Sequence, residues 1–225
     1  MSKVFVALDV ATLAEAVALV DCLSGEAPRV KVGLELFAAE GPEAVRVFTS
    51  RGLEVFLDLK LHDIPETVRR AAEAASKLGA RYLTVHASGG MAMLEAAVAG
   101  AGPTCGILAV TVLTSLANSD LEADGNSLTA EALCVRRARL AVEAGCAGVI
   151  ASPREAAAIR AAVGAEPLIV TPGVRPAGSA LGDQKRVDTP AAAILAGASA
   201  VVIGRPIRDA LDPLAALRAI EAELR

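Results

Sequence analysis

The chain has 225 residues, of which 54% are hydrophobic and only 2% aromatic, and it carries a formal net charge of −4 at pH 7. This length suits one large core and predicts a single domain over residues 1–225. The acidic balance and the scarcity of rings for base stacking argue against nucleic acid as a partner, and charges recur too often for the roughly 18 apolar residues of a membrane span.

Short apolar runs alternate with Ala-, Leu- and Glu-rich stretches of helical spacing along the chain. The predicted strands are 4–9, 30–33, 55–60, 82–86, 107–111, 148–151, 168–171 and 200–204. The predicted helices are 13–23, 42–51, 65–78, 91–99, 130–144, 153–163 and 213–224. Pro opens several of these helices, and Gly follows several others, as is typical of helix ends.

Eight strands that alternate with helices predict an α/β fold, a parallel (β/α)8 TIM barrel. An open doubly wound sheet is the alternative, although no Gly-x-Gly-x-x-Gly fingerprint follows the first strand. The Gly- and Ser-rich segment 176–185 is interpreted as a mobile loop rather than a linker.

The four cysteines are Cys22, Cys105, Cys134 and Cys146, and none forms a Cys-x-x-Cys pair. With only two His residues in the chain, no metal site is expected. Dispersed cysteines in apolar surroundings predict buried free thiols in a reducing, cytoplasmic compartment. The start of the chain does not resemble a signal peptide.

Polar residues gather where the predicted strands end. They are Asp9, Lys31, Asp58, Lys60, His86, Thr111 followed by Thr114 and Ser115, Arg175, and Gly204 with Arg205. In a barrel these carboxyl ends share one rim, which is where barrel enzymes hold their sites.

Asp58 and Lys60 lie two residues apart on one strand and should face the same side. A structural ion pair is the alternative, but this spacing is poor geometry for a closed pair, which favours a functional role. Lys31 lies between two valines and needs a partner, which Asp9 or Asp58 could supply. Asp9 could equally cap the helix that starts at residue 13.

Asp63, Pro65 and Glu66 fit a helix N-cap with its capping-box partner, and this local pattern favours a cap. His62 is interpreted as a packing residue, and His86 as a hydrogen-bonded core histidine.

Gly204 and Arg205 after the last strand, with Arg175 after the seventh, suit a phosphate clamp. Thr114 and Gln184 are candidate ligand donors, but either could cap a loop.

Among the polar residues at the predicted strand ends, a lysine flanked by carboxylates is the best-placed proton donor. Such neighbours favour the charged amine, which argues against a Schiff base. The array supports delivery of a proton to carbon.

The Asp-x-Lys-x-x-Asp array in residues 57–67 resembles that of the orotidine 5′-phosphate decarboxylases. The resemblance extends over nearly the whole chain, through residues 7–9, 31–33, 85–90, 110–115, 171–176, 182–184 and 202–206. The array alone is shared with related sugar-phosphate decarboxylases and lyases, whereas its Lys-Leu-His-Asp-Ile-Pro continuation is more specific. One departure is Glu66, where Asn is common in the family.

The resemblance implies conversion of orotidine 5′-monophosphate to uridine 5′-monophosphate and CO₂, with no cofactor. By position, Lys60 would protonate C6 and Asp58 would face the departing carboxylate. Lys31 and Asp9 would hold the ribose hydroxyls and complete the charge network. Thr114 would contact the pyrimidine.

Gly204 and Arg205 would bind phosphate, with Gln184 in a closing loop and Arg175 at its entry. Asp63 and Thr67 would reach the neighbouring subunit's site, which implies a homodimer. Two alternatives remain at this point: a metal-dependent sugar-phosphate decarboxylase or lyase, and a non-catalytic protein that binds uridine monophosphate.

Overall fold

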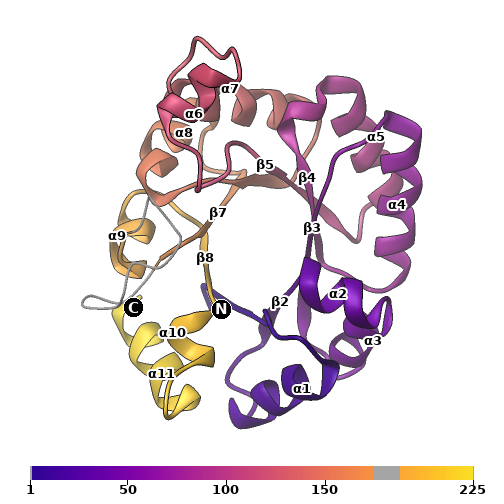
Figure 1. Ribbon diagram of the computed structural model, residues 1–225, viewed down its shortest axis with the longest axis vertical. Helices are drawn as coiled ribbons and strands as arrows, with labels where there is room; N and C mark the ends of the chain where they lie inside the picture. Colours follow the sequence, from indigo (N-terminus) through magenta and orange to yellow (C-terminus); the bar gives the residue numbers. More distant parts are fainter. Residues whose placement is uncertain (1, 175–187, 225) are drawn as a thin grey trace.

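The computed structural model describes residues 2–174 and 188–224, whose strands form a closed parallel barrel in the order of the chain (Figure 1). The strands are β1 Val4–Ala7, β2 Arg29–Gly33, β3 Glu54–Leu61, β4 Tyr82–His86, β5 Gly106–Val110, β6 Gly148–Ile150, β7 Leu168–Pro172 and β8 Ala200–Ile203. The last strand pairs with the first. The predicted α/β barrel is confirmed, and the open sheet is wrong.

Helices surround the ring of strands (Figure 1). They are α1 Leu13–Cys22, α2 Leu34–Glu40, α3 Glu43–Thr49, α4 Pro65–Lys77, α5 Met91–Ala101, α6 Asn118–Ala123, α7 Ala130–Glu143, α8 Ala156–Val163, α9 Pro190–Leu195, α10 Arg205–Arg208 and α11 Pro213–Glu223, with 3₁₀ turns η1 Ala87–Gly89 and η2 Pro153–Glu155. Among the described residues, none of these helices is long and apolar enough to cross a membrane.

All seven predicted helices are present, but the predicted helix 153–163 divides into η2 and α8. Four further helices, α2, α6, α9 and α10, were not predicted. They have seven, six, six and four residues, respectively. Such short segments hold too few turns for a 3.6-residue period to stand out.

The predicted capping box at the start of α4 is wrong. Pro65 favours an extended conformation in the residue before it, so Ile64, at φ −59° and ψ 151°, takes the N-cap position. Asp63 lies one residue too early, and its carboxylate accepts a hydrogen bond from the Ile64 N–H at 2.6 Å. Glu66 pairs along the helix with Arg69 instead.

The apolar core has two layers, one between the strands and the surrounding helices and one inside the barrel. The inner layer contains Phe5, Phe56 and Tyr82, whose rings pack edge to face, with Phe5 5.5 Å from Phe56 and 6.0 Å from Tyr82. Aromatic residues are few, yet three of them belong to the cluster inside the barrel. Side chains two residues further along these strands point to the same interior, so the aromatic layer supports the rim above it.

The prediction of buried thiols holds for three cysteines and fails for one. Cys105, Cys134 and Cys146 are buried, whereas Cys22 is exposed at the last residue of α1. Burial raises the pKa of Cys105 to about 11 and that of Cys146 to about 12, so both remain protonated thiols at neutral pH.

Candidate active site

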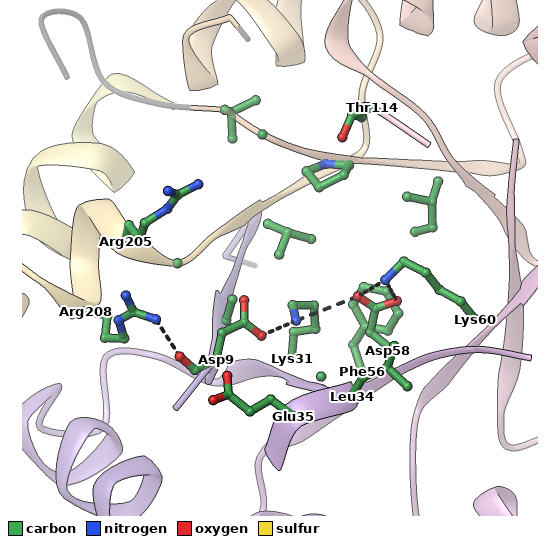
Figure 2. Close-up of a pocket in the computed structure, with 18 of the residues that line it drawn as sticks. Asp9, Lys31, Leu34, Glu35, Phe56, Asp58, Lys60, Thr114, Arg205 and Arg208 are labelled. Atoms are coloured by element: carbon green, nitrogen blue, oxygen red, sulfur yellow. Dashed lines mark hydrogen bonds and ion pairs between the residues drawn. The ribbon is translucent and has the colours of Figure 1, made fainter. Parts of the chain in front are cut away.

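A cavity of about 500 Å³ opens at the carboxyl ends of the strands (Figure 2). The charged side chains among its lining residues are Asp9, Lys31, Glu35, Asp58, Lys60, Arg205 and Arg208. Arg205 and Arg208 lie at one end of the cavity and Lys60 at the other (Figure 2). The sequence prediction that strand-end polar residues share one rim is confirmed for Asp9, Lys31, Asp58, Lys60 and Arg205.

Lys31 of β2 lies at the centre of a charge array that consists of Asp9, Lys31, Asp58 and Lys60. Its Nζ is 2.7 Å from Asp9 Oδ1 and 3.7 Å from Asp58 Oδ2, and the residue is only 7% exposed. Both of the partners that the sequence offered are therefore used. The helix cap that was the other possibility for Asp9 belongs to Thr12, which accepts from the Glu15 N–H at the start of α1.

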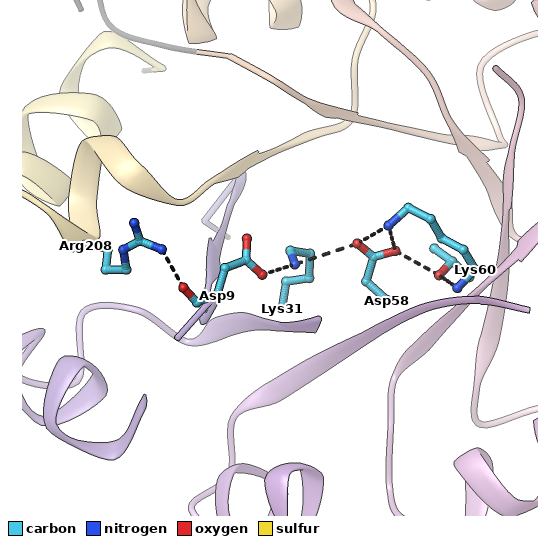
Figure 3. Close-up of polar contacts among 6 residues, drawn as sticks. Asp9, Lys31, Asp58, Lys60 and Arg208 are labelled. Carbon is cyan, nitrogen blue, oxygen red and sulfur yellow. Dashed lines mark hydrogen bonds and ion pairs between the residues drawn. The ribbon is translucent and has the colours of Figure 1, made fainter. Parts of the chain in front are cut away.

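Asp58 and Lys60 pair directly, contrary to the expectation from their spacing, although Asp58 also lies near Lys31. Lys60 Nζ donates to Asp58 Oδ1 at 2.9 Å and to Oδ2 at 2.8 Å (Figure 3). The reason is a β-bulge, at which the β3–β4 register shifts and Lys60 adopts a left-handed φ of 50°. The rule that side chains of a strand alternate between its two faces fails at Lys60, so this side chain can turn back toward Asp58.

Two opposing effects act on the pKa of Asp58. Burial alone would raise it, but the charges of Lys31 and Lys60, and hydrogen bonds from Lys60 and Thr84, hold the pKa below its ordinary value. The carboxylate is therefore ionised at neutral pH. It presents a fixed negative charge between two ammonium groups.

Gly33, the last residue of β2, leaves room for the contact between Asp9 and Lys31. A Cβ at this position would lie 2.7 Å from Asp9 Oδ1 and 2.9 Å from Lys31 Nζ. Any larger residue would therefore disturb the pair that it adjoins.

The opposite end of the cavity carries two guanidinium groups from α10. Gly204 and Arg205 lie there as predicted, and Arg208 adds a second positive side chain. Arg208 donates to the backbone carbonyl of Asp9, which links this end to the charge array (Figure 3). An anionic group such as phosphate fits this end of the cavity.

Thr114 also lines the cavity, on the loop after β5. Asp63 and Thr67 are exposed and are not among the described residues that line it. Arg175 and Gln184, like the predicted loop 176–185, lie outside the described residues.

The two histidines lie beside the array. The ring of His86, at the end of β4, is 5.4 Å from that of His62. His86 is half-buried rather than a core residue. Burial lowers its pKa, and the charges of His62 and Lys60 lower it further, which favours the neutral ring.

Three residues at or beside the cavity were not recognised in the sequence. Arg208 and Glu35 lie on the short helices α10 and α2. Thr84 is a fully buried residue inside the apolar strand β4, where threonine is an ordinary strand former. The sequence around each of these residues does not mark it as a site residue, because its place at the cavity depends on which distant segments fold against it.

This arrangement can do a limited set of chemistry. Lys60 can deliver a proton into the cavity, and Asp58 holds that ammonium in place. Across the described ranges 2–174 and 188–224, no group of three His, Cys, Asp or Glu side chains is placed to hold a metal ion.

Comparisons with known proteins match this chain over almost its full length. The family model described as orotidine 5′-phosphate decarboxylase / HUMPS family matches residues 2–220. The chain is 58% identical over 222 residues to orotidine 5′-phosphate decarboxylase of Anaeromyxobacter sp. strain K, covering 99% of this chain and 98% of that protein. The Moorella thermoacetica enzyme is 55% identical over 231 residues, covering 99% of this chain and 92% of that one.

Solved structures agree with the sequence relatives. The crystal structure of orotidine 5′-phosphate decarboxylase from Lactobacillus acidophilus has a TM-score of 0.88 at 38% identity, with all of both chains covered. The structure of the enzyme from Pyrococcus horikoshii has a TM-score of 0.81 at 28% identity, covering 99% of each chain.

Proposed function

The chain belongs to the orotidine 5′-phosphate decarboxylase / HUMPS family, and we propose that Lys60 is the proton donor of the decarboxylation that this family performs. The reaction converts orotidine 5′-monophosphate to uridine 5′-monophosphate and CO₂, the final step of pyrimidine nucleotide synthesis. The protein is thus a carbon–carbon lyase that acts on a nucleotide.

In the proposed step, the bond between C6 of the pyrimidine and its carboxyl carbon breaks, and the electron pair stays on C6 as CO₂ leaves. Lys60 Nζ then gives its proton to C6. This carbanion lies in the plane of the ring and gains no π delocalisation, so a preorganised cation must stabilise it. An ammonium about 4 Å away contributes roughly 4 kcal/mol at an effective dielectric near 20.

One such contact does not supply the whole barrier reduction, so binding of the rest of the nucleotide has to contribute. We place the phosphate at Gly204 and Arg205, the ribose hydroxyls at Asp9 and Lys31, and the pyrimidine near Thr114. Arg175 and Gln184 are proposed to close over the phosphate.

The observation that carries this proposal is the alternation of charge at Lys31, Asp58 and Lys60. Asp58 is held beside the ammonium by hydrogen bonds of 2.8 and 2.9 Å. We propose that the same carboxylate faces the departing carboxyl group of the substrate. Binding alone would not require a buried carboxylate next to an anionic substituent.

The test is the loss of orotidine 5′-monophosphate absorbance in the presence of EDTA. The wild-type protein should convert the substrate under these conditions. The Lys60→Ala variant should not convert it but should still bind uridine 5′-monophosphate. Lys77→Ala is the matched control, because Lys77 is exposed on α4 and pairs with Glu73. Dependence on a metal would instead favour the lyase alternative, and binding without turnover would favour the non-catalytic one.

We further propose a homodimer in which Asp63 and Thr67 complete the partner's site. The exposure of both residues, and of the adjacent Ile64 at 68%, supports this assignment. Mixing inactive Lys60→Ala and Asp63→Ala chains should restore about a quarter of wild-type activity, because half of randomly paired dimers carry one intact site. No recovery after mixing would show that the sites are not shared.

The cytoplasm is proposed as the location of the protein. The free thiols Cys105, Cys134 and Cys146 support a reducing compartment.

A further inference from the structure

The bulge beside the charge array is held by one buried hydroxyl group. Leu57 pairs with Leu83 and Leu61 pairs with Val85, so three residues of β3 lie opposite the single residue Thr84 of β4. Its side chain is fully buried. The bulge therefore has one polar side chain facing it from the neighbouring strand.

Thr84 contacts both members of the Asp58–Lys60 pair. Its Oγ1 accepts a hydrogen bond from the Lys60 backbone N–H at 2.8 Å and donates one to Asp58 Oδ1 at 2.9 Å. A hydroxyl can accept and donate at once. This single group thereby fixes the backbone of one charged residue relative to the carboxylate of the other.

Both contacts satisfy groups that the bulge leaves in need of partners. A backbone N–H that a bulge displaces from regular strand pairing must find an acceptor other than a carbonyl group of the paired strand. Lys60 also holds a left-handed φ of 50°, which costs a non-glycine residue free energy unless its surroundings enforce it. Thr84 supplies that enforcement from a strand that carries neither charge.

We propose that Thr84 is a positioning residue for the decarboxylation, because its hydroxyl sets the distance and angle between the Asp58 carboxylate and the Lys60 ammonium. This inference rests on the proposed roles of Asp58 and Lys60. A displacement of about 1 Å at such a pair can lower a rate roughly a hundredfold.

A purely structural role would make Thr84 resemble the other buried threonines of the barrel. The Thr171 hydroxyl, also fully buried, donates to the Ala200 carbonyl at 3.4 Å. It stabilises strand pairing and has no charged partner in the described contacts. Thr171→Val is therefore the matched control for the loss of a buried hydroxyl.

The experiment compares Thr84→Val, Thr84→Ser and Thr171→Val for turnover of orotidine 5′-monophosphate and for uridine 5′-monophosphate affinity. Thr84→Val should lower kcat about tenfold to a hundredfold, while nucleotide affinity changes by less than about twofold. Thr84→Ser keeps the hydroxyl and should restore most of kcat. Thr171→Val should keep the wild-type kcat.

The pH profile gives a readout that a structural role would not move. Without the Thr84 hydrogen bond the pKa of Asp58 rises, so the acid limb of kcat should move to higher pH in Thr84→Val and not in Thr171→Val. If Thr84→Val does not fold, Thr84→Ala removes the same hydroxyl with less crowding.

The inference is overturned if the variants without a hydroxyl match wild type in kcat, or if Thr84→Ser is as slow as Thr84→Val. Lys60→Ala separates this result from the proposed function. An active Lys60→Ala enzyme refutes the proposed proton donor whatever the Thr84 variants do. An inactive Lys60→Ala enzyme with fully active Thr84→Val refutes only the positioning role.

Discussion

Replacing Lys31 by methionine tests whether the charge array is one interdependent unit. Lys31 Nζ lies 3.7 Å from Asp58 Oδ2, and the two side chains are only 8% and 13% exposed. At this separation two unit charges attract by about 4 kcal/mol at an effective dielectric near 20. Because Lys60 remains beside Asp58, we expect Lys31→Met to lower the free energy of unfolding by about 3 kcal/mol, the lower end for a broken buried pair.

Asp9→Asn is the matched control for the other contact of Lys31. The side chain of Asp9 is 47% exposed, so water replaces much of the lost interaction. We expect this variant to cost no more than about 1 kcal/mol. Adding Asp58→Asn to Lys31→Met should recover part of the lost stability, because it removes a buried carboxylate that has lost one of its two ammonium partners.

Urea unfolding followed by circular dichroism measures these differences, and the pH dependence gives their sign. The pKa of Asp58 is depressed in the folded wild type, so its contribution is present above the ordinary pKa of 3.8 and is lost as the pH falls through the folded value. Without Lys31 the folded pKa rises, and the carboxyl takes up a proton at a higher pH. The penalty of Lys31→Met should therefore shrink on acidification.

Two results would refute this reasoning. Equal losses in Lys31→Met and Asp9→Asn would mean that burial does not set the strength of these pairs. A double variant less stable than Lys31→Met alone would mean that the Asp58 charge is not the source of the penalty.

Two further predictions concern the histidine pair and the helix packing. The pKa of His86 is lowered, so below the ordinary value of 6.5 the unfolded chain binds more protons than the folded protein, and the stability decreases as the pH decreases. His86→Gln should weaken this dependence of the urea midpoint between about pH 7 and pH 5. An unchanged slope would refute the prediction. A Cβ at Gly100 would lie 2.0 Å from the Arg69 carbonyl oxygen, so Gly100→Ala should force α4 and α5 apart and cost about 3 kcal/mol in urea unfolding. Gly102→Ala meets nothing within 4 Å and should cost only about 1 kcal/mol, from its φ of 64°; similar losses in the two glycine variants would contradict the packing argument.

The barrel and its rim of polar residues could be predicted from the amino-acid sequence. Strand and helix periods are local properties, and eight alternations leave few ways to bury every apolar face. Parallel strands then place their carboxyl ends together, so Asp9, Lys31, Asp58, Lys60 and Arg205 could be assigned to one site before any contact was known.

The contacts among these residues depend on segments that are far apart in the chain. The Asp58–Lys60 pair lies at a bulge, where the Lys60 N–H donates to the hydroxyl of Thr84, 24 positions away on the next strand. Asp63 lost its predicted cap because Pro65 moved the helix start by one residue. A spacing rule describes a regular strand, whereas register is set by the neighbouring strand, and so the geometry of the ion pair could not be read from the segment that contains it.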